Sequence, residues 1–186
     1  MSDKQTDNSF LKDKIILREE VINSIQDEIY LLDCYAGKGK IWSLIISRNP
    51  KRKINYIGIE KEKNKNKNLS VMEGDNIKYL QKLDLPLFNF IDLDAYGIPF
   101  EQIDIIMNSK FIGYICVTYI HTGMGRLPDN MLLKLGYSKE MIGKCPTLFS
   151  RNHKDKIKKI LGIYGITSIN LIEKGKKLYF YFKKDW

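Results

Sequence analysis

Residues 30–42 constrain the fold of this 186-residue chain more than any other stretch. They read Tyr-Leu-Leu-Asp-Cys-Tyr-Ala-Gly-Lys-Gly-Lys-Ile-Trp, with a turn marked by Gly37 and Gly39. The apolar residues 30–32 predict a short buried strand, and residues 40–48 predict a helix. A strand, a glycine turn and a helix in this order are typical of the first crossover of a nucleotide-binding α/β sheet. There, glycines let the backbone approach a ligand, and the helix amino terminus offers free N–H groups.

A second predicted strand, residues 54–60, ends in an acidic residue. Glu60 lies 21 positions after Gly39. A carboxylate about 20 residues beyond a glycine turn is placed to bind both hydroxyls of a ribose. Enzymes that use NAD and enzymes that use S-adenosyl-L-methionine (SAM) share this arrangement, so the form of the glycine turn must distinguish them.

The glycine turn favours SAM over NAD. The NAD fingerprint requires a third glycine, and its position is occupied by Trp42. Residues 33–39 instead resemble the Asp-x-Phe/Tyr-Ala-Gly-x-Gly variant of many nucleic-acid methyltransferases. The resemblance implies SAM as cofactor, with Glu60 at its ribose. It also implies that the cofactor contacts Asp33, Tyr35, Ala36, Gly37 and Gly39.

A third strand is predicted over residues 69–72, and Asp75 follows it. Asp75 is also placed to cap a helix predicted over residues 77–83. In SAM methyltransferases an aspartate at this place commonly accepts a hydrogen bond from the adenine amino group. The resemblance therefore implies that Asp75 and its neighbour Asn76 belong to the cofactor site.

A fourth strand, predicted over residues 87–91, leads into an acidic and aromatic segment. Asp92 and Asp94 are two residues apart, so their side chains point to the same side of an extended chain. Open α/β sheets bind ligands beyond the carboxyl ends of their strands, so we expect these residues near the methyl donor. An exocyclic base amine is a poor nucleophile because its lone pair is delocalised into the ring. Asp94 can accept its N–H hydrogen bond and Tyr96 can stack on the base, while Asp92 orients the loop or the amino end of the donor.

Residues 92–97, Asp-Leu-Asp-Ala-Tyr-Gly, resemble the Asp-x-Asp-Pro-Phe/Tyr-Gly motif of tRNA guanine-N2 methyltransferases. Residues 113–118 are similar to the Gly-x-Leu-x-Val-Thr segment of that family. The resemblance spans about residues 30–120 and implies that Asp94 and Tyr96 lie at the base. Ala95 departs from the motif, which has proline there, and we expect no appended RNA-binding domain.

The segment after the fifth predicted strand adds two candidate substrate contacts. His121 is interpreted as a proton acceptor or a base contact, and Arg126 as a phosphate contact. A structural or solvent-exposed role stays open for both. Cys145 precedes Pro146, the reverse of the Pro-Cys nucleophile of cytosine-C5 methyltransferases, and we do not assign it that role.

The remaining pattern completes an α/β sheet. Residues 15–29 predict an amphipathic helix, residues 132–142 a helix broken at Gly136, and residues 153–161 a basic helix. Residues 166–173 and 177–183 predict a hairpin about Gly175. A terminal antiparallel hairpin after five parallel strands is the usual ending of the SAM methyltransferase sheet. We therefore predict a Rossmann-like, doubly wound sheet of about seven strands with helices on both faces. It would form a single domain over residues 13–186, after a flexible segment over residues 1–12.

Composition narrows the class of protein further. Hydrophobic residues make up 44% of the chain, and no apolar run approaches the roughly 20 residues of a membrane span. The polar amino terminus predicts no signal peptide, and three cysteines without metal spacing predict a reduced, cytoplasmic protein without a metal site. The net charge of +9 favours a polyanionic partner, although an AT-rich genome would produce the same wealth of Lys, Asn, Ile and Tyr.

We therefore predict a SAM-dependent N-methyltransferase that acts on an exocyclic amine of a nucleic-acid base. The acceptor would be RNA, with tRNA guanine N2 as the most specific form of the prediction, or DNA. Two alternatives stay open. One is a methyltransferase of small molecules or proteins, and the other is a nucleic-acid-binding scaffold that keeps the fold without catalysis.

Overall fold

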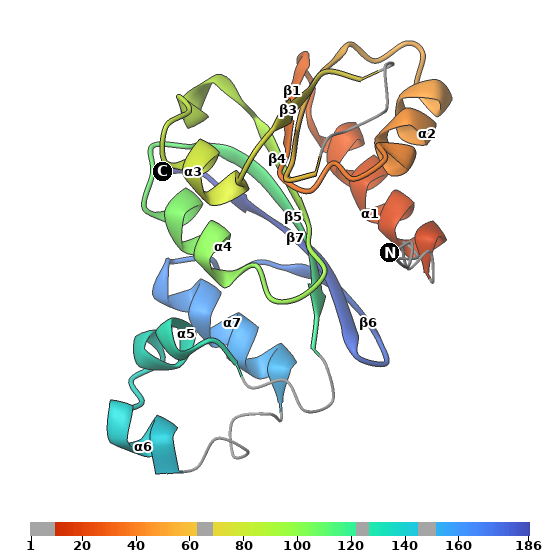
Figure 1. Ribbon diagram of the computed structural model, residues 1–186. Coiled ribbons are helices and arrows are strands. Elements are labelled where there is room, and N and C mark those ends of the chain that lie inside the picture. The colour runs from red at the N-terminus through yellow and green to blue at the C-terminus, as the bar shows by residue number, and fades with distance from the viewer. Residues whose placement is uncertain (1–9, 63–68, 122–126, 145–151) are drawn as a thin grey trace, which may run out of the picture.

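The computed structural model describes residues 10–62, 69–121, 127–144 and 152–186, which form a layered α/β structure (Figure 1). The helices are α1 (Leu11–Ser24), α2 (Lys40–Arg48), α3 (Asn76–Leu80), α4 (Phe100–Met107), α5 (Asp129–Lys134), α6 (Lys139–Lys144) and α7 (His153–Ile163). The strands are β1 (Ile29–Asp33), β2 (Ile54–Glu60), β3 (Val71–Glu73), β4 (Phe90–Asp94), β5 (Gly113–Ile120), β6 (Asn170–Lys174) and β7 (Lys177–Lys184).

The strands form a seven-stranded sheet in the order β3-β2-β1-β4-β5-β7-β6. Strands β1 to β5 pair in parallel, whereas β7 is antiparallel to both β5 and β6. This confirms the predicted doubly wound sheet and its terminal antiparallel hairpin. The strand order reverses between β1 and β4, so their carboxyl ends border the crevice in which such sheets bind ligands.

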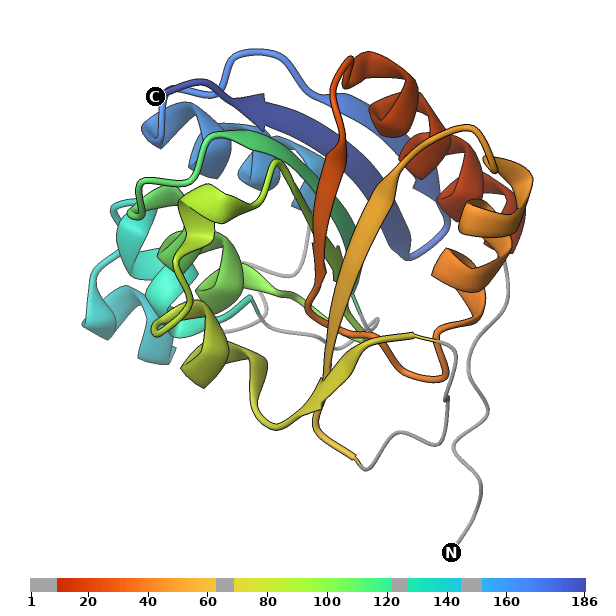
Figure 2. The ribbon, with the colours of Figure 1, turned by 90° about the horizontal axis from the view of Figure 1, so that it is seen from above.

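Each face of the sheet carries its own hydrophobic core. Helices α1 and α2 pack on one face, where the largest fully buried side chain is Trp42. Helices α3 to α7 cover the other face, and Figure 2 shows the two helical layers on opposite sides of the twisted sheet. Strand β1 is buried at four of its five positions, as expected for a parallel strand with helices on both sides.

Several predicted boundaries agree with the structure. Strand β2 and helix α2 match their predicted ranges, and α5 and α6 lie on either side of Gly136. Helix α1 begins at Leu11, inside the segment predicted to be flexible, and ends at Ser24, five residues before the predicted end at Ile29. Ile29 is the first residue of β1.

The prediction for the fourth strand was wrong by three residues. Residues Leu85–Leu87 form a 3-10 turn with Pro86 inside it, and Leu87 is 67% exposed. The strand is therefore Phe90–Asp94, so Asp92 and Asp94 are part of it rather than beyond its end. Helix α4 was not among the predicted elements.

No helix in the described part of the chain combines the length and the apolar character needed to cross a bilayer.

Candidate active site

The glycine turn after β1 is held against the end of β2. The Gly37 amide donates a hydrogen bond to Glu60 Oε2 at 2.7 Å, and the Ala36 amide donates to the Ile59 carbonyl at 3.0 Å. Gly37 and Gly39 have φ values of 51° and 68°, a region that favours glycine. A Cβ added at Gly37 would meet only the Tyr35 carbonyl oxygen, at 3.9 Å, so the backbone there is open to a ligand.

Gly58 lets the turn lie this close to β2. A Cβ at Gly58 would lie 2.8 Å from the Ala36 Cβ and 2.6 Å from the Tyr56 hydroxyl oxygen. Both distances are too short for real contacts. The absent side chain therefore permits the approach that brings Glu60 to the glycine turn.

Asp33 fixes the start of the turn from inside the sheet. It is 3% exposed and lies in register between Gly58 of β2 and Asp92 of β4. Its carboxylate accepts hydrogen bonds from the Tyr35 amide and the Tyr56 hydroxyl, both at 3.0 Å. Burial and the charge of Asp92 raise the pKa of Asp33 well above its usual value. Asp33 thus lies beneath the turn.

Asp75 and Asn76 shape the third loop of the site. Asp75 Oδ1 accepts hydrogen bonds from the Ile77 and Lys78 amides, which confirms the predicted helix cap. The Asn76 side-chain amide donates to the Cys34 carbonyl at 2.8 Å. Asn76 Oδ1 also accepts a hydrogen bond from Gln102 of α4 at 3.0 Å. Asn76 therefore ties the end of β1 to α3 and α4.

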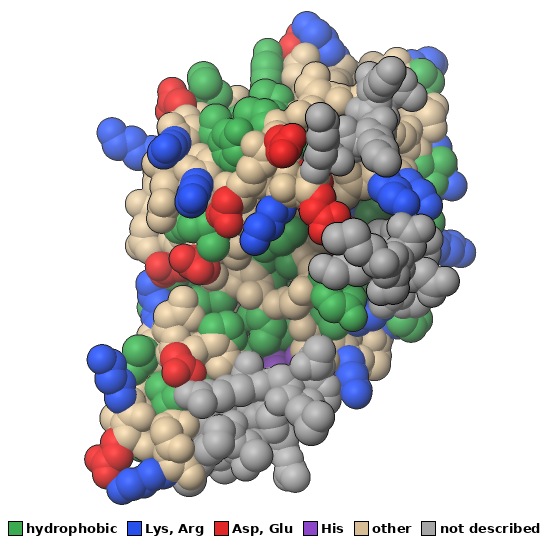
Figure 3. All heavy atoms as spheres, viewed as in Figure 1, with side chains coloured by type: hydrophobic (Ala, Val, Ile, Leu, Met, Phe, Trp, Pro, Cys, Tyr) green, Lys and Arg blue, Asp and Glu red, His purple; other side chains and the backbone are tan. Residues whose placement is uncertain are grey.

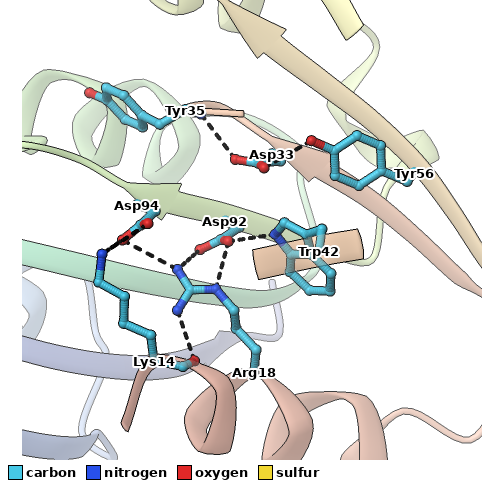
Figure 4. Close-up of polar contacts among 8 residues, drawn as sticks. All are labelled: Lys14, Arg18, Asp33, Tyr35, Trp42, Tyr56, Asp92 and Asp94. Carbon is cyan, nitrogen blue, oxygen red and sulfur yellow. Dashed lines mark hydrogen bonds and ion pairs between the residues drawn. The ribbon is translucent and has the colours of Figure 1, made fainter. Parts of the chain in front are cut away.

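The two carboxylates of β4 are bound by cations from α1 (Figure 4). Arg18 Nε and Nη2 donate to the two oxygens of Asp92 at 2.7 Å each, and Trp42 Nε1 adds a third hydrogen bond at 2.8 Å. Lys14 Nζ lies 2.8 Å from Asp94 Oδ1 and 3.0 Å from Asp94 Oδ2. Asp92 and Asp94 therefore point to the same side of β4, as predicted.

The α1 cations keep Asp94 charged, whereas burial raises the pKa of Asp92 in spite of Arg18. Burial alone would raise the pKa of Asp94, but the charges of Arg18 and Lys14 outweigh it and hold that pKa below its usual value. Burial would likewise lower the pKa of Arg18, yet the neighbouring Asp92 raises it above its usual range. Asp94 is therefore a carboxylate at neutral pH.

A cleft of about 320 Å³ opens where the loops after β1 and β4 meet. Its lining residues are Tyr35, Ala95, Tyr96, Gly97, Ile98, Glu101, Gln102, Pro128 and Asn130. Tyr96 is 83% exposed, and a Cβ added at Gly97 would meet nothing within 4 Å. The segment after Asp94 therefore presents an aromatic ring and open backbone to a ligand.

His121 lies at the end of β5, beside the Gly97 loop. The Ile120 amide donates to the Gly97 carbonyl at 2.8 Å. The His121 ring stacks on His153, with centroids 4.1 Å apart and planes 9° from parallel. The His153 Nδ1 is 2.6 Å from the Tyr119 hydroxyl. Partial burial lowers the pKa of His121, so its imidazole is neutral at neutral pH.

The structure brings together most of the predicted site residues at the carboxyl edge of the sheet. Two residues singled out in the sequence, Arg126 and Cys145, lie outside the described residues. Among the residues that are described, no group of three or more His, Cys, Asp or Glu side chains is arranged to hold a metal ion.

Several residues of the site were missed in the sequence: Lys14, Arg18, Trp42, Tyr56 and Gln102. A signal existed for the first two. Lys14 and Arg18 are four positions apart, on the same helix stripe as the buried Val21 and Ile22. Cations on the apolar face of a helix indicate a buried acidic partner, because an unpaired buried charge is costly.

Charges of both signs are mixed on the face of the molecule that Figure 3 shows. On the face in Figure 3, Lys and Arg side chains alternate with Asp and Glu, without one continuous basic patch among the residues shown in colour. The basic helix α7 carries the exposed Lys158 and Lys159, while its Lys154 lies 3.9 Å from Glu173. The face in Figure 3 thus offers a polyanionic partner no continuous basic patch among the described residues.

No family model and no curated protein sequence matches the chain. Solved structures do resemble it. A SAM-dependent methyltransferase from Archaeoglobus fulgidus superposes with a TM-score of 0.57 at 14% identity, over 93% of both chains. A putative ribosomal RNA methyltransferase from Plasmodium falciparum gives a TM-score of 0.58 at 13% identity, over 97% of this chain and 98% of its own. The plantazolicin methyltransferase BpumL, in complex with SAH, gives 0.57 at 13% identity, over 95% of this chain and 84% of its own.

These likenesses establish the fold of a SAM-dependent methyltransferase. All three neighbours are named as methyltransferases, and at 13–14% identity the likeness concerns the fold alone. Their names span different acceptors, so the likeness of fold does not select one.

Proposed function

We propose that the protein is a SAM-dependent N-methyltransferase that acts on an exocyclic amine of a nucleic-acid base. The observation that carries the proposal is the position of Asp94 and Tyr96. Asp94 ends β4 and Tyr96 follows two residues later. Tyr96 is 83% exposed and lines the cleft together with Tyr35 of the glycine turn. An acidic acceptor followed by an exposed aromatic ring suits a planar base that carries an amine.

The residues around the glycine turn fit SAM. Among the described residues, no side chain lies within 4 Å of a Cβ placed at Gly37 or Gly97, and Glu60 reaches the turn from the end of β2. In this proposal Glu60 binds the ribose and Asp75 with Asn76 borders the adenine, while the turn from Tyr35 to Gly39 follows the rest of the cofactor. When bound, SAM supplies a methyl group already activated by its positive sulfur.

The residues of the chain then have mainly a positioning task, because the methyl group needs no further activation. Asp94 accepts the N–H hydrogen bond of the amine, which localises the nitrogen lone pair for attack. Tyr96 stacks on the base and fixes its plane. Asp92 is 1% exposed and bound by Arg18, so its proposed role is to orient Asp94 and the loop rather than to contact the donor.

Three observations bear on the acceptor. The net charge of +9 and the resemblance of residues 92–97 to tRNA guanine-N2 methyltransferases favour RNA, and one structural neighbour is named as a ribosomal RNA enzyme. In this reading His121 and Arg126 contact the base or its phosphate. The uncharged ring of His121, stacked on His153, can receive a proton or pack on a base.

Calorimetry with SAM tests the cofactor site first. We expect micromolar-range binding by the wild type and a loss of at least about tenfold, or about 1.4 kcal/mol, in Glu60→Ala. Glu62→Ala is the matched control, because this neighbouring acid is exposed. A wild type that does not bind SAM would leave the non-catalytic scaffold as the better reading.

Transfer of tritiated methyl groups tests the acceptor. We expect incorporation into total tRNA, and inhibition of that transfer by an unrelated polyanion such as heparin. Incorporation into small amines or peptides, with no effect of heparin, would instead support a methyltransferase of small molecules or proteins.

A further inference from the structure

The spacing of two charged pairs matches between α1 and β4. Lys14 and Arg18 are four positions apart, so they lie on one face of the helix about one turn from each other. Asp92 and Asp94 are two positions apart, so they lie on one face of the strand. The two spacings are both close to 6–7 Å, given about 1.5 Å per helix residue and about 3.3 Å per strand residue. Each cation therefore lies closest to one carboxylate, and Arg18 Nη2 also lies 3.6 Å from Asp94 Oδ1.

The four residues form a closed ring of contacts. Arg18 binds Asp92 through two nitrogen atoms, and its third nitrogen, Nη1, donates to the Lys14 carbonyl at 2.9 Å. Lys14 then reaches Asp94. Arg18 thus fixes both the carboxylate beside Asp94 and the backbone that carries Lys14 (Figure 4).

The two pairs differ in their access to solvent. The Arg18 and Asp92 side chains are each 1% exposed, whereas Lys14 is 11% and Asp94 16% exposed. The Arg18–Asp92 pair is therefore shielded from solvent. The Lys14–Asp94 pair borders the segment that continues into the cleft at Ala95 and Tyr96. Asp94 Oδ1 is buried and lies near both Lys14 and Arg18. A carboxylate oxygen has about two lone pairs, and Oδ2 accepts one hydrogen bond from Lys14. Asp94 is therefore held at Oδ1, and a further donor would reach it at Oδ2.

We infer that α1 is part of the acceptor site, with Lys14 as a positioning residue that fixes the Asp94 carboxylate and Arg18 as its anchor. This inference rests on the proposed function, in which Asp94 accepts the hydrogen bond of the amine. It adds two residues that precede the whole nucleotide-binding pattern in the sequence. It also ties the acceptor site to the amino-terminal helix.

The charge of Lys14 affects how activity depends on pH. Asp94 is surrounded by Lys14 and Arg18 of α1, Asp92 of its own strand, Asp33 of β1 and Cys116 of β5. Burial would raise the pKa of Asp94, but the two cations lower it below its usual value. Removing the charge of Lys14 must raise that pKa, so the acidic limb of the activity profile should move to higher pH.

The experiment compares Lys14→Met, Lys14→Arg and Lys12→Met. Lys12 is an exposed lysine on the same helix and serves as the matched control. For Lys14→Met we expect kcat for methyl transfer into total tRNA to fall at least about tenfold, as a small displacement of a positioned group does. We expect its acidic limb to move up in pH and its SAM affinity to stay within about twofold. Lys14→Arg should recover most of the activity, and Lys12→Met should match the wild type. An unchanged kcat and pH profile in Lys14→Met, with the fold intact, would overturn the inference.

A second readout separates this inference from the proposed function. Carboxyl ¹³C NMR reports the titration of Asp94 directly, and the Asp94 signal is assigned by its loss in Asp94→Asn. We expect Asp94 to titrate at higher pH in Lys14→Met than in the wild type. If the wild type binds SAM but methylates no nucleic acid, the proposed function is wrong, whatever the NMR result. If the Asp94 titration is the same in both proteins, Lys14 does not hold Asp94 and the inference fails by itself.

Discussion

Arg18 of α1 binds both carboxylate oxygens of Asp92 of β4, 74 residues away, and each side chain is 1% exposed. Breaking such a buried pair leaves one charge without its partner, which typically costs about 3–5 kcal/mol. We therefore expect Arg18→Met to lower the free energy of unfolding by about that amount in urea titrations. The double variant Arg18→Met/Asp92→Asn should be more stable than Arg18→Met alone, because the orphaned charge is gone.

The control for this prediction is Lys53→Met, which removes the exposed ion pair of Lys53 with Glu28. Exposed pairs contribute little, so we expect no measurable change in its unfolding midpoint. If Arg18→Met and Lys53→Met unfold at the same urea concentration, the buried Arg18–Asp92 pair does not stabilise the fold as expected.

A single methyl group at Gly58 should disturb the glycine turn. Its Cβ would lie 2.8 Å from the Ala36 Cβ, so Gly58→Ala must push the turn away from β2. We expect a loss of about 1–3 kcal/mol in stability from overpacking. We also expect SAM binding to weaken at least about tenfold, because Glu60 and Gly37 would separate. Calorimetry and urea unfolding measure the two effects.

Gly143→Ala is the matched control, since Gly143 lies in α6 and its added Cβ would meet nothing within 4 Å. Alanine favours a helix over glycine by up to about 1 kcal/mol, so this variant should be as stable as the wild type or more so. If Gly58→Ala and Gly143→Ala have the same affinity for SAM, the close approach of the turn to β2 is not needed for SAM binding.

The class of fold was predictable because its signals are local. The glycine turn after β1, the acidic end of β2 and the hairpin about Gly175 each lie within a few residues of sequence. These signals determine the alternation of strands and helices, and connection rules then limit how the strands can be ordered. The predicted sheet was confirmed for that reason.

Helix α4 was missed because its isoleucines resemble a strand. The segment Phe100–Met107 contains three isoleucines, which have a high preference for strands. Its buried residues Phe100, Ile103, Ile106 and Met107 nevertheless recur at helical spacing. Counting that spacing would have found the helix.

The partners of the β4 carboxylates were not predictable with the same ease. Lys14 and Arg18 are separated from Asp94 and Asp92 by 80 and 74 residues. Their pairing depends on how α1 packs across the sheet, and no local pattern encodes that packing. Only the position of two cations on the apolar face of α1 gives a hint, and it does not say which acids they meet.

Tyr96→Ala should weaken recognition of the acceptor without changing the affinity for SAM. The ring is 83% exposed and therefore contributes little to the core. Stacking of a base on an aromatic side chain contributes about 1–3 kcal/mol, so we expect kcat/KM for total tRNA to fall roughly 5- to 150-fold. SAM affinity should stay within about twofold. Tritium transfer and calorimetry measure these quantities separately.

Tyr96→Phe keeps the ring and should retain most of the activity. Leu87→Ala removes another exposed apolar side chain, 67% exposed and at the opposite end of β4, and should behave as the wild type does. Equal losses in Tyr96→Phe and Tyr96→Ala would mean that the hydroxyl, and not stacking, is the contact that matters.

Asp33→Asn should change how stability depends on pH. Burial and the charge of Asp92 raise the pKa of Asp33 in the folded protein well above its unfolded value. Its favourable contribution is then complete below the unfolded pKa and is lost as pH rises through the folded pKa. Asparagine does not titrate, and it can still accept from the Tyr35 amide and contact the Tyr56 hydroxyl. As pH rises from about 4 to about 8, the free energy of unfolding should therefore fall less in Asp33→Asn than in the wild type.

Urea unfolding of both proteins across this pH range tests the sign of that effect. Asp94 has the opposite dependence, since its lowered pKa adds stability that is lost as pH falls, but it is present in both proteins and cancels in the comparison. The difference in unfolding free energy between Asp33→Asn and the wild type should therefore grow with pH. A difference that stays constant would mean that Asp33 titrates alike in the folded and unfolded chains, and that its carboxylate is not destabilised beside Asp92.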